Sequence, residues 1–308
     1  MNRVIFGDCR DTMRDLKAQG VRVQCCVTSP PYYGLRDYGH PGQIGLEKTP
    51  AEYVAALVEV FDGVRELLAD DGVLWLNLGD SYAASGMGAG SGKQLTNRGT
   101  AAGGHMDKPR KAPEGLKPKD LVGAPWRVAF ALQEAGWYLR QDIIWHKPNP
   151  MPESVTDRCT KAHEYLFLLT KSERYFFDHV AIQEPETMKP QNRLTPRKAN
   201  PDAKVHGMPE YRQQEGGTGG GMRNRRSVWT VPTQPYSGAH FAVFPAALIE
   251  PCVLAGSRPG DVVLDPFMGS GTTAQVAQAL GRQWIGCELN TEYAPLQQAR
   301  TAQAALAI

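Results

Sequence analysis

The sequence predicts an α/β fold: a mostly parallel, doubly wound sheet of the Rossmann-like kind with a basic, loop-rich insertion. Three observations support this prediction. Apolar, β-branched runs alternate along the chain with segments whose apolar residues recur at helical spacing. The predicted strands are almost continuously apolar, which is typical of parallel strands covered on both faces. At 308 residues, the chain is long enough to bury a substantial core.

Each predicted element has a local signal. A helix is predicted where Leu, Met or aromatic residues lie three or four positions apart, and it ends at a glycine such as Gly20 or Gly136. A strand is predicted where a short apolar run meets turn-forming residues, and Asp71-Gly72 is expected to separate a helix from the strand that follows. In chain order, the pattern predicts strands at 4–6, 21–28, 73–78, 138–145, 165–170, 174–177, 262–264 and 284–287, and helices at 10–19, 51–69, 121–135, 244–255, 272–280 and 291–305.

Composition and charge exclude several classes of protein. Hydrophobic residues make up 42% and charged residues 21% of the chain, with 34 Lys and Arg against 32 Asp and Glu, which is typical of a globular protein. No apolar run approaches the roughly 18 residues of a membrane span, and the N-terminus lacks the pattern of a secretory signal. We therefore expect a cytoplasmic protein without membrane contact. The six cysteines form no C-x-x-C pair and the seven histidines have no metal-binding spacing, so we expect no metal site.

Two long segments combine basic charge with a composition that cannot build a core. Residues 186–226 carry a net charge of +5, and residues 85–120 carry +4. Segment 85–120 also contains eight glycines and no Val, Ile, Phe, Trp or Tyr, so we expect a flexible basic loop there. Structureless stretches of this length within a compact domain are usually either functional or disordered.

A glycine turn follows the strand predicted at 262–264. Gly269 and Gly271 can adopt positive φ and let a ligand approach the backbone, and the next helix offers unpaired N–H groups at its start. The turn is not a P-loop, because no Gly-Lys-Ser/Thr follows it. Glu288 ends the next predicted strand, where an acidic residue commonly binds the ribose hydroxyls of an adenosine. A nucleotide-like ligand is therefore expected at this edge of the sheet.

The glycine turn belongs to a longer motif, Asp265-Pro266-Phe267-Met268-Gly269-Ser270-Gly271-Thr272-Thr273, and a second motif, Thr28-Ser29-Pro30-Pro31-Tyr32, lies near the N-terminus. Together they resemble the paired signature of the amino-group DNA methyltransferases that use S-adenosylmethionine, the N4-cytosine and N6-adenine family. Their order resembles the permuted class called beta, and the segments 7–9, 144–150 and 240–257 resemble further blocks of that family. The resemblance implies a Rossmann-like methyltransferase sheet, S-adenosylmethionine as the cofactor and double-stranded DNA as the partner.

The resemblance implies a catalytic turn at Ser29, Pro30, Pro31 and Tyr32. The exocyclic amine of a base is a poor nucleophile, so the enzyme has to orient it toward the methyl donor. Ser29 Oγ and the Pro30 carbonyl can accept the amine hydrogens, and Tyr32 offers a flat face on which an extruded base can stack. The cofactor-binding residues that the resemblance implies are Asp8, Thr28, Asp265, Pro266, Phe267, Gly269, Ser270, Gly271, Thr272 and Glu288.

The first residue of the catalytic turn bears on the target base. A Ser-Pro-Pro-Tyr form resembles the N4-cytosine enzymes, whereas Asp or Asn in place of the serine is typical of N6-adenine enzymes. Ser29 therefore favours cytosine N4 and leaves adenine N6 as the alternative. C5-cytosine methylation is disfavoured, because it needs a nucleophilic cysteine at this turn and Pro-Cys occurs only at Pro251-Cys252, within an apolar helix. Distant alternatives are an NAD-dependent oxidoreductase and a non-catalytic DNA-binding protein, and RNA stays open as a substrate.

The resemblance and the charge pattern divide the chain into three parts. Residues 1–171 and 236–308 are expected to form the catalytic and S-adenosylmethionine-binding α/β domain, in circularly permuted order, and residues 172–235 the target-recognition region. The basic loop 85–120 is expected to clamp DNA. The expected DNA-binding residues are Arg223, Asn224, Arg225 and Arg226, because arginine neutralises phosphates and both residue types read base edges. A cognate restriction nuclease is a candidate partner, and we expect a monomer or a homodimer.

Overall fold

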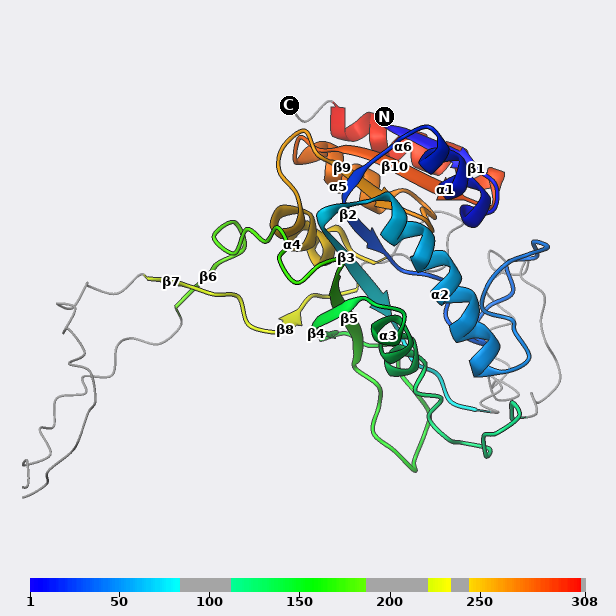
Figure 1. Cartoon of the computed structure of the whole chain (residues 1–308). Helices are drawn as coiled ribbons and strands as arrows, with labels where there is room; N and C mark the ends of the chain where they lie inside the picture. The colour runs from blue at the N-terminus through cyan, green and yellow to red at the C-terminus, as the bar shows by residue number, and fades with distance from the viewer. Residues whose placement is uncertain (84–111, 187–220, 234–243, 306–308) are drawn as a thin grey trace, which may run out of the picture.

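An eight-stranded sheet runs through the molecule, with helices on both of its faces (Figure 1). The computed structural model describes residues 1–83, 112–186, 221–233 and 244–305. The strands follow the order β1-β10-β9-β2-β3-β5-β4-β8, so segments from the two ends of the chain are neighbours in the sheet. The architecture confirms the prediction of a mostly parallel α/β sheet.

The described part of the chain contains short strands that the pattern did not predict, β6, β7 and β8. In the main sheet the strands are β1 (Arg3–Phe6), β2 (Val23–Thr28), β3 (Leu68–Leu78), β4 (Tyr138–His146), β5 (His163–Thr170), β8 (Val228–Thr230), β9 (Val262–Asp265) and β10 (Gln283–Glu288). A separate ladder pairs β6 (Glu184–Pro185) with β7 (Met222–Arg223). The helices are α1 (Cys9–Ala18), α2 (Pro50–Leu67), α3 (Ala124–Glu134), α4 (Ala246–Gly256), α5 (Thr272–Ala279), the short 3-10 helix η2 (Thr291–Tyr293) and α6 (Ala294–Ala305). Among these helices, none is long and apolar enough to cross a membrane.

One strand of the described sheet, β5, runs against its neighbours. It pairs antiparallel with β3 and β4, while the other neighbouring strands are parallel. The carboxyl ends of the parallel strands therefore meet at one edge, and β5 begins at that same edge. Open α/β sheets bind their ligands at this edge. Here β2 ends at Thr28, β9 at Asp265 and β10 at Glu288.

Alternate side chains of the central strand β3 enter two separate cores. Leu74 and Leu76 pack with residues of α1, α2 and α3 on one face, whereas Val73 and Trp75 pack with residues of α4 and α5 on the other. The alternation follows from the two-residue period of a strand, and both faces remove apolar side chains from water. This is the doubly wound arrangement that the sequence predicts.

Two local predictions are wrong. Asp71-Gly72 does not separate helix from strand: β3 begins at Leu68, directly after α2, and runs through both residues with a register shift against β2. The strand predicted at 174–177 does not form, since its apolar residues serve as packing side chains, and Phe177 lies against Trp75 with ring centroids 6.2 Å apart. Most of the basic loop predicted at 85–120 lies outside the described residues, as does much of the region 172–235.

Gly256, the last residue of α4, marks a tight contact between this helix and the sheet. A β-carbon there would lie 2.7 Å from Val73 Cγ2 and 2.8 Å from Cys25 Sγ. We expect Gly256→Ala to lower the free energy of unfolding by about 1–3 kcal/mol, because overpacking pushes the helix off the strands. Urea unfolding measures the change. Gly63→Ala in α2 is the matched control, since its β-carbon meets the flexible end of Met13 at 3.1 Å, and equal losses in both variants would contradict this account.

Candidate active site

Two motifs that lie far apart in the sequence meet at the carboxyl edge of the sheet. Thr28 Oγ1, at the end of β2, donates a hydrogen bond of 2.6 Å to Asp265 Oδ1, at the end of β9. Thr273 Oγ1, in α5, donates to the other carboxylate oxygen, Oδ2, at 2.6 Å. The structure thus brings the Ser-Pro-Pro-Tyr turn and the glycine turn together.

Asp265 is a buried carboxylate that the protein itself engages. Only 1% of its surface is exposed, and Phe267 N adds a third hydrogen bond, of 3.0 Å, to Oδ1. Burial raises the pKa of this carboxyl, while the hydrogen bonds from the three donors oppose the shift. Both oxygens are therefore used to join the two turns, and contact of this side chain with a cofactor stays a prediction.

The glycine turn has the backbone geometry that the sequence analysis expects. Gly269 has φ 53° and Gly271 has φ 90°, in the left-handed region that favours glycine. Gly271 is also the N-cap of α5, and no side chain caps the start of this helix. Gln297 Nε2, in α6, donates to Gly269 O at 2.7 Å and holds the turn from outside. A glycine turn at an uncapped helix start can cradle a nucleotide-like ligand.

The other predicted residues of the glycine turn differ in exposure. Pro266, Ser270 and Thr272 are buried, whereas Phe267 is partly exposed. Thr272 Oγ1 accepts a hydrogen bond of 2.6 Å from Arg300 Nη1. Of these four side chains, Phe267 is therefore the most accessible to a ligand, and the other three shape the turn.

Two further acidic residues stand at neighbouring strand ends. Glu288 accepts hydrogen bonds from Gly269 N at 2.7 Å and from Asn290 N at 2.8 Å, one on each carboxylate oxygen. Burial raises the pKa of Glu288 to about 7. Asp8 caps α1 by accepting from Arg10 N at 2.9 Å, and the hydrogen-bonded Arg10 guanidinium lowers the pKa of Asp8. Each oxygen of Glu288 keeps a second lone pair, so this carboxylate can still accept from a hydroxyl group.

A loop that the sequence analysis did not assign to the site lies beside Glu288. Gly34 N donates to Gly45 O at 2.7 Å and closes the segment between them. Burial and the nearby charge of Glu288 raise the pKa of Tyr38 in this loop, while Arg36 lowers it. No motif marks this loop, which is held by its own hydrogen bonds, such as Tyr38 N to Gln43 Oε1 at 2.8 Å.

The Ser-Pro-Pro-Tyr turn is anchored to α2. The fully buried Tyr53 donates its hydroxyl to Pro31 O at 2.9 Å. Its ring lies against Tyr33, with centroids 5.4 Å apart, so Tyr33 is a packing residue. Pro30 is buried and Ser29 is partly exposed. The backbone of the turn is therefore anchored by Tyr53, while Ser29 keeps part of its surface exposed.

Tyr32 is held by residues that lie outside both motifs. Its hydroxyl donates to Glu164 Oε2 at 2.7 Å and lies 3.2 Å from Asn77 Oδ1, and Glu164 forms an ion pair with Lys147. A β-carbon at Gly79 would collide with Cε2 of the Tyr32 ring, so the ring packs directly on this glycine. Sequence reasoning missed these partners, because only the antiparallel course of β5 brings Glu164 to this edge.

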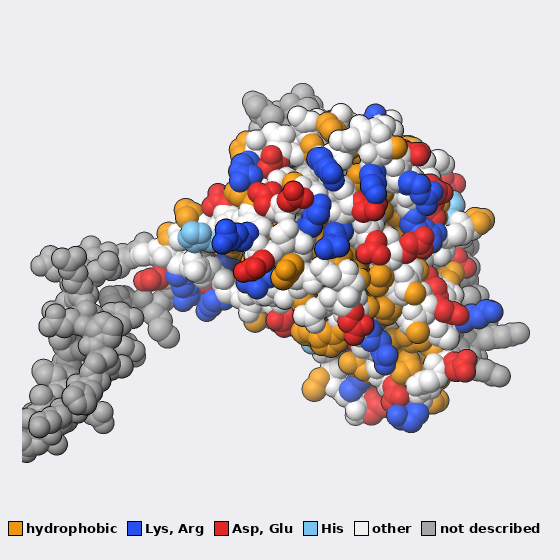
Figure 2. All heavy atoms as spheres, viewed as in Figure 1, with side chains coloured by type: hydrophobic (Ala, Val, Ile, Leu, Met, Phe, Trp, Pro, Cys, Tyr) orange, Lys and Arg blue, Asp and Glu red, His pale blue; other side chains and the backbone are white. Residues whose placement is uncertain are grey.

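The arginine cluster predicted to bind DNA contacts other protein residues in this structure. Arg223 Nε and Arg226 Nε both donate to Glu184 Oε1, at 3.0 Å and 2.6 Å. The Arg225 guanidinium lies 4.6 Å from the ring centroid of Trp229. On the face of the molecule in Figure 2, basic and acidic side chains of the described residues are interspersed. Contact of the four residues 223–226 with DNA stays a prediction.

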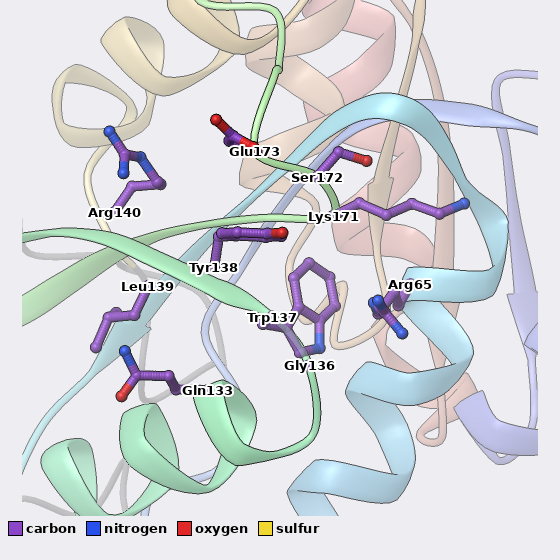
Figure 3. A pocket seen from close by; sticks show the side chains of 10 residues that line it. All are labelled: Arg65, Gln133, Gly136, Trp137, Tyr138, Leu139, Arg140, Lys171, Ser172 and Glu173. Carbon is purple, nitrogen blue, oxygen red and sulfur yellow. The ribbon is translucent and has the colours of Figure 1, made fainter.

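A cavity of about 580 Å³ lies at the opposite edge of the sheet (Figure 3). Trp137 and Tyr138, at the start of β4, line it together with Lys171, which directly follows β5. Lys171 Nζ already donates to Leu68 O at 2.7 Å and lies 3.4 Å from Asp70 Oδ1. The cavity therefore lies at the amino ends of the parallel strands, whereas the two motifs lie at the carboxyl ends.

The cysteines and histidines of the described ranges form no metal-binding cluster. No group of three or more His, Cys, Asp or Glu residues there could hold a metal ion. All six cysteines are free thiols, and Cys159 is exposed while the other five are buried.

A doubly wound sheet whose carboxyl edge joins a glycine turn to a Ser-Pro-Pro-Tyr turn has the organisation of an amino-methyltransferase. Residues 23–299 match the family of N6-adenine and N4-cytosine methyltransferases, which is described as DNA methylase. The chain belongs to this family. It is therefore a DNA methyltransferase.

Relatives and solved structures cover nearly the whole chain. M.SmaI of Serratia marcescens, named a Type II methyltransferase, is 49% identical over 298 residues, 97% of this chain and 90% of that protein. M.Cfr9I of Citrobacter freundii, named likewise, is 48% identical over 287 residues, 93% of this chain and 83% of that protein. The PvuII DNA methyltransferase, described as cytosine-N4-specific, has a TM-score of 0.61 at 19% identity, covering 97% and 85% of the two chains. TTHA0409 of Thermus thermophilus, solved with S-adenosylmethionine, has a TM-score of 0.58 at 22% identity, covering 99% and 94%. The solved structures at this identity establish the fold.

The role of Asp265 as the link between the turns predicts different outcomes for two substitutions. Asp265→Ala leaves three buried donors, Thr28 Oγ1, Thr273 Oγ1 and Phe267 N, without their acceptor. We expect it to lower the free energy of unfolding by about 3 kcal/mol. Asp265→Asn keeps one acceptor oxygen, and its amide can donate to Thr273 if that hydroxyl turns toward Val27 O, 3.3 Å away. We expect a loss below about 1 kcal/mol in urea unfolding, and equal losses for the two variants would contradict this role.

Proposed function

We propose that the protein is a Type II DNA methyltransferase that methylates the exocyclic N4 of cytosine in double-stranded DNA after base flipping. The observation that carries the proposal is the link through Asp265, which sets the Ser-Pro-Pro-Tyr turn beside the glycine turn. The names of M.SmaI and M.Cfr9I support the Type II assignment, because the alignments cover most of both proteins. A cognate restriction nuclease as partner, and a monomer or homodimer as the acting form, belong to the same proposal.

The residues at the carboxyl edge fit S-adenosylmethionine. Gly269 and Gly271 let a ligand approach the backbone, and Glu288 offers free lone pairs for ribose hydroxyls. We assign Phe267 and Asp8 to the walls of the same site. The cofactor-binding set remains Asp8, Thr28, Asp265, Pro266, Phe267, Gly269, Ser270, Gly271, Thr272 and Glu288, with Thr28 and Asp265 acting through the link between the turns.

The catalytic turn would orient the amine rather than activate a nucleophile of its own. S-adenosylmethionine, when bound, supplies a methyl group on a sulfonium centre. Ser29 Oγ and Pro30 O accept the amine hydrogens, which leaves the nitrogen lone pair free to point at the methyl group. The Tyr53 hydroxyl donates a hydrogen bond to Pro31 O and so holds the turn. The flat face of the Tyr32 ring supports the extruded base.

Cytosine N4 is favoured over two other target atoms. Ser29 at the first position of the turn resembles N4-cytosine enzymes, and adenine N6 is the alternative that the product test below would identify. C5 methylation lacks its nucleophile, because Cys252 is fully buried in α4 and burial raises the pKa of its thiol well above the ordinary value.

We assign DNA contact to the region 172–235, with residues 1–171 and 236–308 as the catalytic domain and 85–120 as a DNA-clamping loop. Arg223, Asn224, Arg225 and Arg226 are the proposed contacts. In the absence of DNA, the Glu184 carboxylate accepts hydrogen bonds from the guanidinium groups of Arg223 and Arg226. Phosphate oxygens would accept hydrogen bonds from the same groups.

Substitution of the catalytic turn tests the proposal directly. We expect Ser29→Ala and Tyr32→Ala each to lower kcat by roughly 100-fold or more, because the amine loses an acceptor or the base loses its support. Affinity for S-adenosylmethionine, measured by calorimetry, should change little. Mass spectrometry of nucleosides from methylated DNA should find N4-methyldeoxycytidine. A fully active Ser29/Tyr32 double alanine variant would overturn the mechanism. Detection of N6-methyldeoxyadenosine instead would show that the target base is adenine.

The raised pKa of Glu288 predicts a pH-dependent cofactor affinity. Ribose hydroxyls donate to the carboxylate, so the ionised form, which gains population as pH rises through about 7, binds better. We expect the ratio of wild-type to Glu288→Gln affinity for S-adenosylmethionine to rise about tenfold between about pH 6 and pH 8. Calorimetry at each pH measures this ratio. Titration of other groups affects both proteins alike, so its effect cancels in the ratio. A constant ratio would show that Glu288 does not bind the ribose as a carboxylate.

A further inference from the structure

We infer that Glu164 is a positioning residue that sets the direction of a hydrogen-bond chain ending at Ser29. The inference rests on the proposed function of Ser29 as an acceptor for the target amine. The chain runs from Ser29 Oγ to Tyr32 OH at 3.4 Å, and from Tyr32 OH to Glu164 Oε2 at 2.7 Å. None of the motifs recognised in the sequence contains Glu164.

The direction of the chain follows from what each group can donate. An ionised carboxylate only accepts hydrogen bonds, so Glu164 requires the Tyr32 hydroxyl to donate. Burial raises the pKa of that hydroxyl well above its ordinary value, which keeps its proton in place. The oxygen of Tyr32 is then left to accept from Ser29. With its hydrogen directed at Tyr32, Ser29 Oγ presents its lone pairs to the target amine.

The surroundings of Glu164 fix it in this role. Its other oxygen, Oε1, forms the ion pair with Lys147, and both side chains are largely buried, with 14% and 17% exposed. Lys147 Nζ lies 4.3 Å from the ring centroid of Trp145, which restricts the ammonium group. The pair is therefore held in place, and Glu164 cannot turn its Oε2 away from Tyr32 without losing the charge partner.

Asn77 supports the same direction from the neighbouring strand β3. Its Nδ2 donates to Tyr165 O at 3.0 Å, which turns its Oδ1 toward Tyr32, 3.2 Å from the hydroxyl. Two acceptors thus face the tyrosine hydroxyl. The ring itself is fixed by its contact with Gly79. The tyrosine hydroxyl therefore directs its hydrogen away from Ser29 and its ring is fixed, whereas a merely structural tyrosine would need only the fixed ring.

Glu164→Gln tests this inference because it preserves size while adding a donor. The new amide can donate to Tyr32, so the tyrosine proton is released to Asn77 Oδ1 or Ser29 Oγ, and it occupies a lone pair that the amine needs whenever it turns to Ser29. We expect kcat to fall at least about fivefold, with the KM for DNA and the affinity for S-adenosylmethionine within about threefold of wild type. Glu153→Gln is the matched control, since Glu153 pairs with Arg158 in the same connection between β4 and β5. It should keep its kcat.

A double-mutant cycle with Tyr32→Phe separates positioning from a structural role. Without the hydroxyl the chain is broken, so Glu164→Gln should cost less than about threefold in the Tyr32→Phe background. The inference is overturned if Glu164→Gln keeps full kcat, or if it costs as much in that background as in wild type. If Glu164→Gln does not fold, Tyr32→Phe alone tests the chain: it keeps the ring but leaves the Ser29 hydrogen without its acceptor, so it should lower kcat, and full kcat would overturn the inference.

Ser29→Ala, assayed in parallel, distinguishes failure of this inference from failure of the proposed function. A fully active Ser29→Ala would remove the role proposed for the catalytic turn. An inactive Ser29→Ala together with a fully active Glu164→Gln would overturn the role of Glu164 alone.

Discussion

The site depends on the buried carboxylate of Asp265. Its hydrogen bonds join β9 to β2 and to α5, across a separation of 237 positions between Thr28 and Asp265 in the sequence. Burying a carboxylate is costly, and the three donors around this one offset that cost. Methyl transfer between two bound molecules needs their reacting atoms in line. A rigid link between the surfaces that would hold the two molecules therefore supports both the fold and the alignment of the reacting atoms.

Much of the fold could be predicted because its signals are local. The strands β2, β9 and β10 are apolar runs that end at recognisable turns, and the apolar residues of the neighbouring helices recur at helical spacing. The prediction failed where apolar residues have another use, as Phe177 does against Trp75. It also failed for β6, β7 and β8, which have only two or three residues each and are too short for a periodic pattern.

The candidate site also has a part that could be predicted from the sequence and a part that could not. Its two motifs could be recognised because each is a continuous stretch of sequence. The partners of Tyr32 could not, because the contact with Glu164 depends on the order and direction of strands β3, β5 and β4. The engagement of Arg223 and Arg226 by Glu184 is also non-local, since it requires β6 and β7 to pair across the segment between them. Strand direction is a property of the whole sheet, and no short window of sequence contains it.

The reversal of β5 has a consequence for how this enzyme can diversify. Since β4 ends at His146 and β5 begins at His163, the connection between them leaves and re-enters the sheet at the same edge. Residues can be added to or removed from such a connection without shifting the register of any strand. Lys147, the first residue of the connection, forms the ion pair with Glu164, which accepts from Tyr32. A longer or shorter connection beyond Lys147 would therefore leave the strands of the carboxyl edge in place.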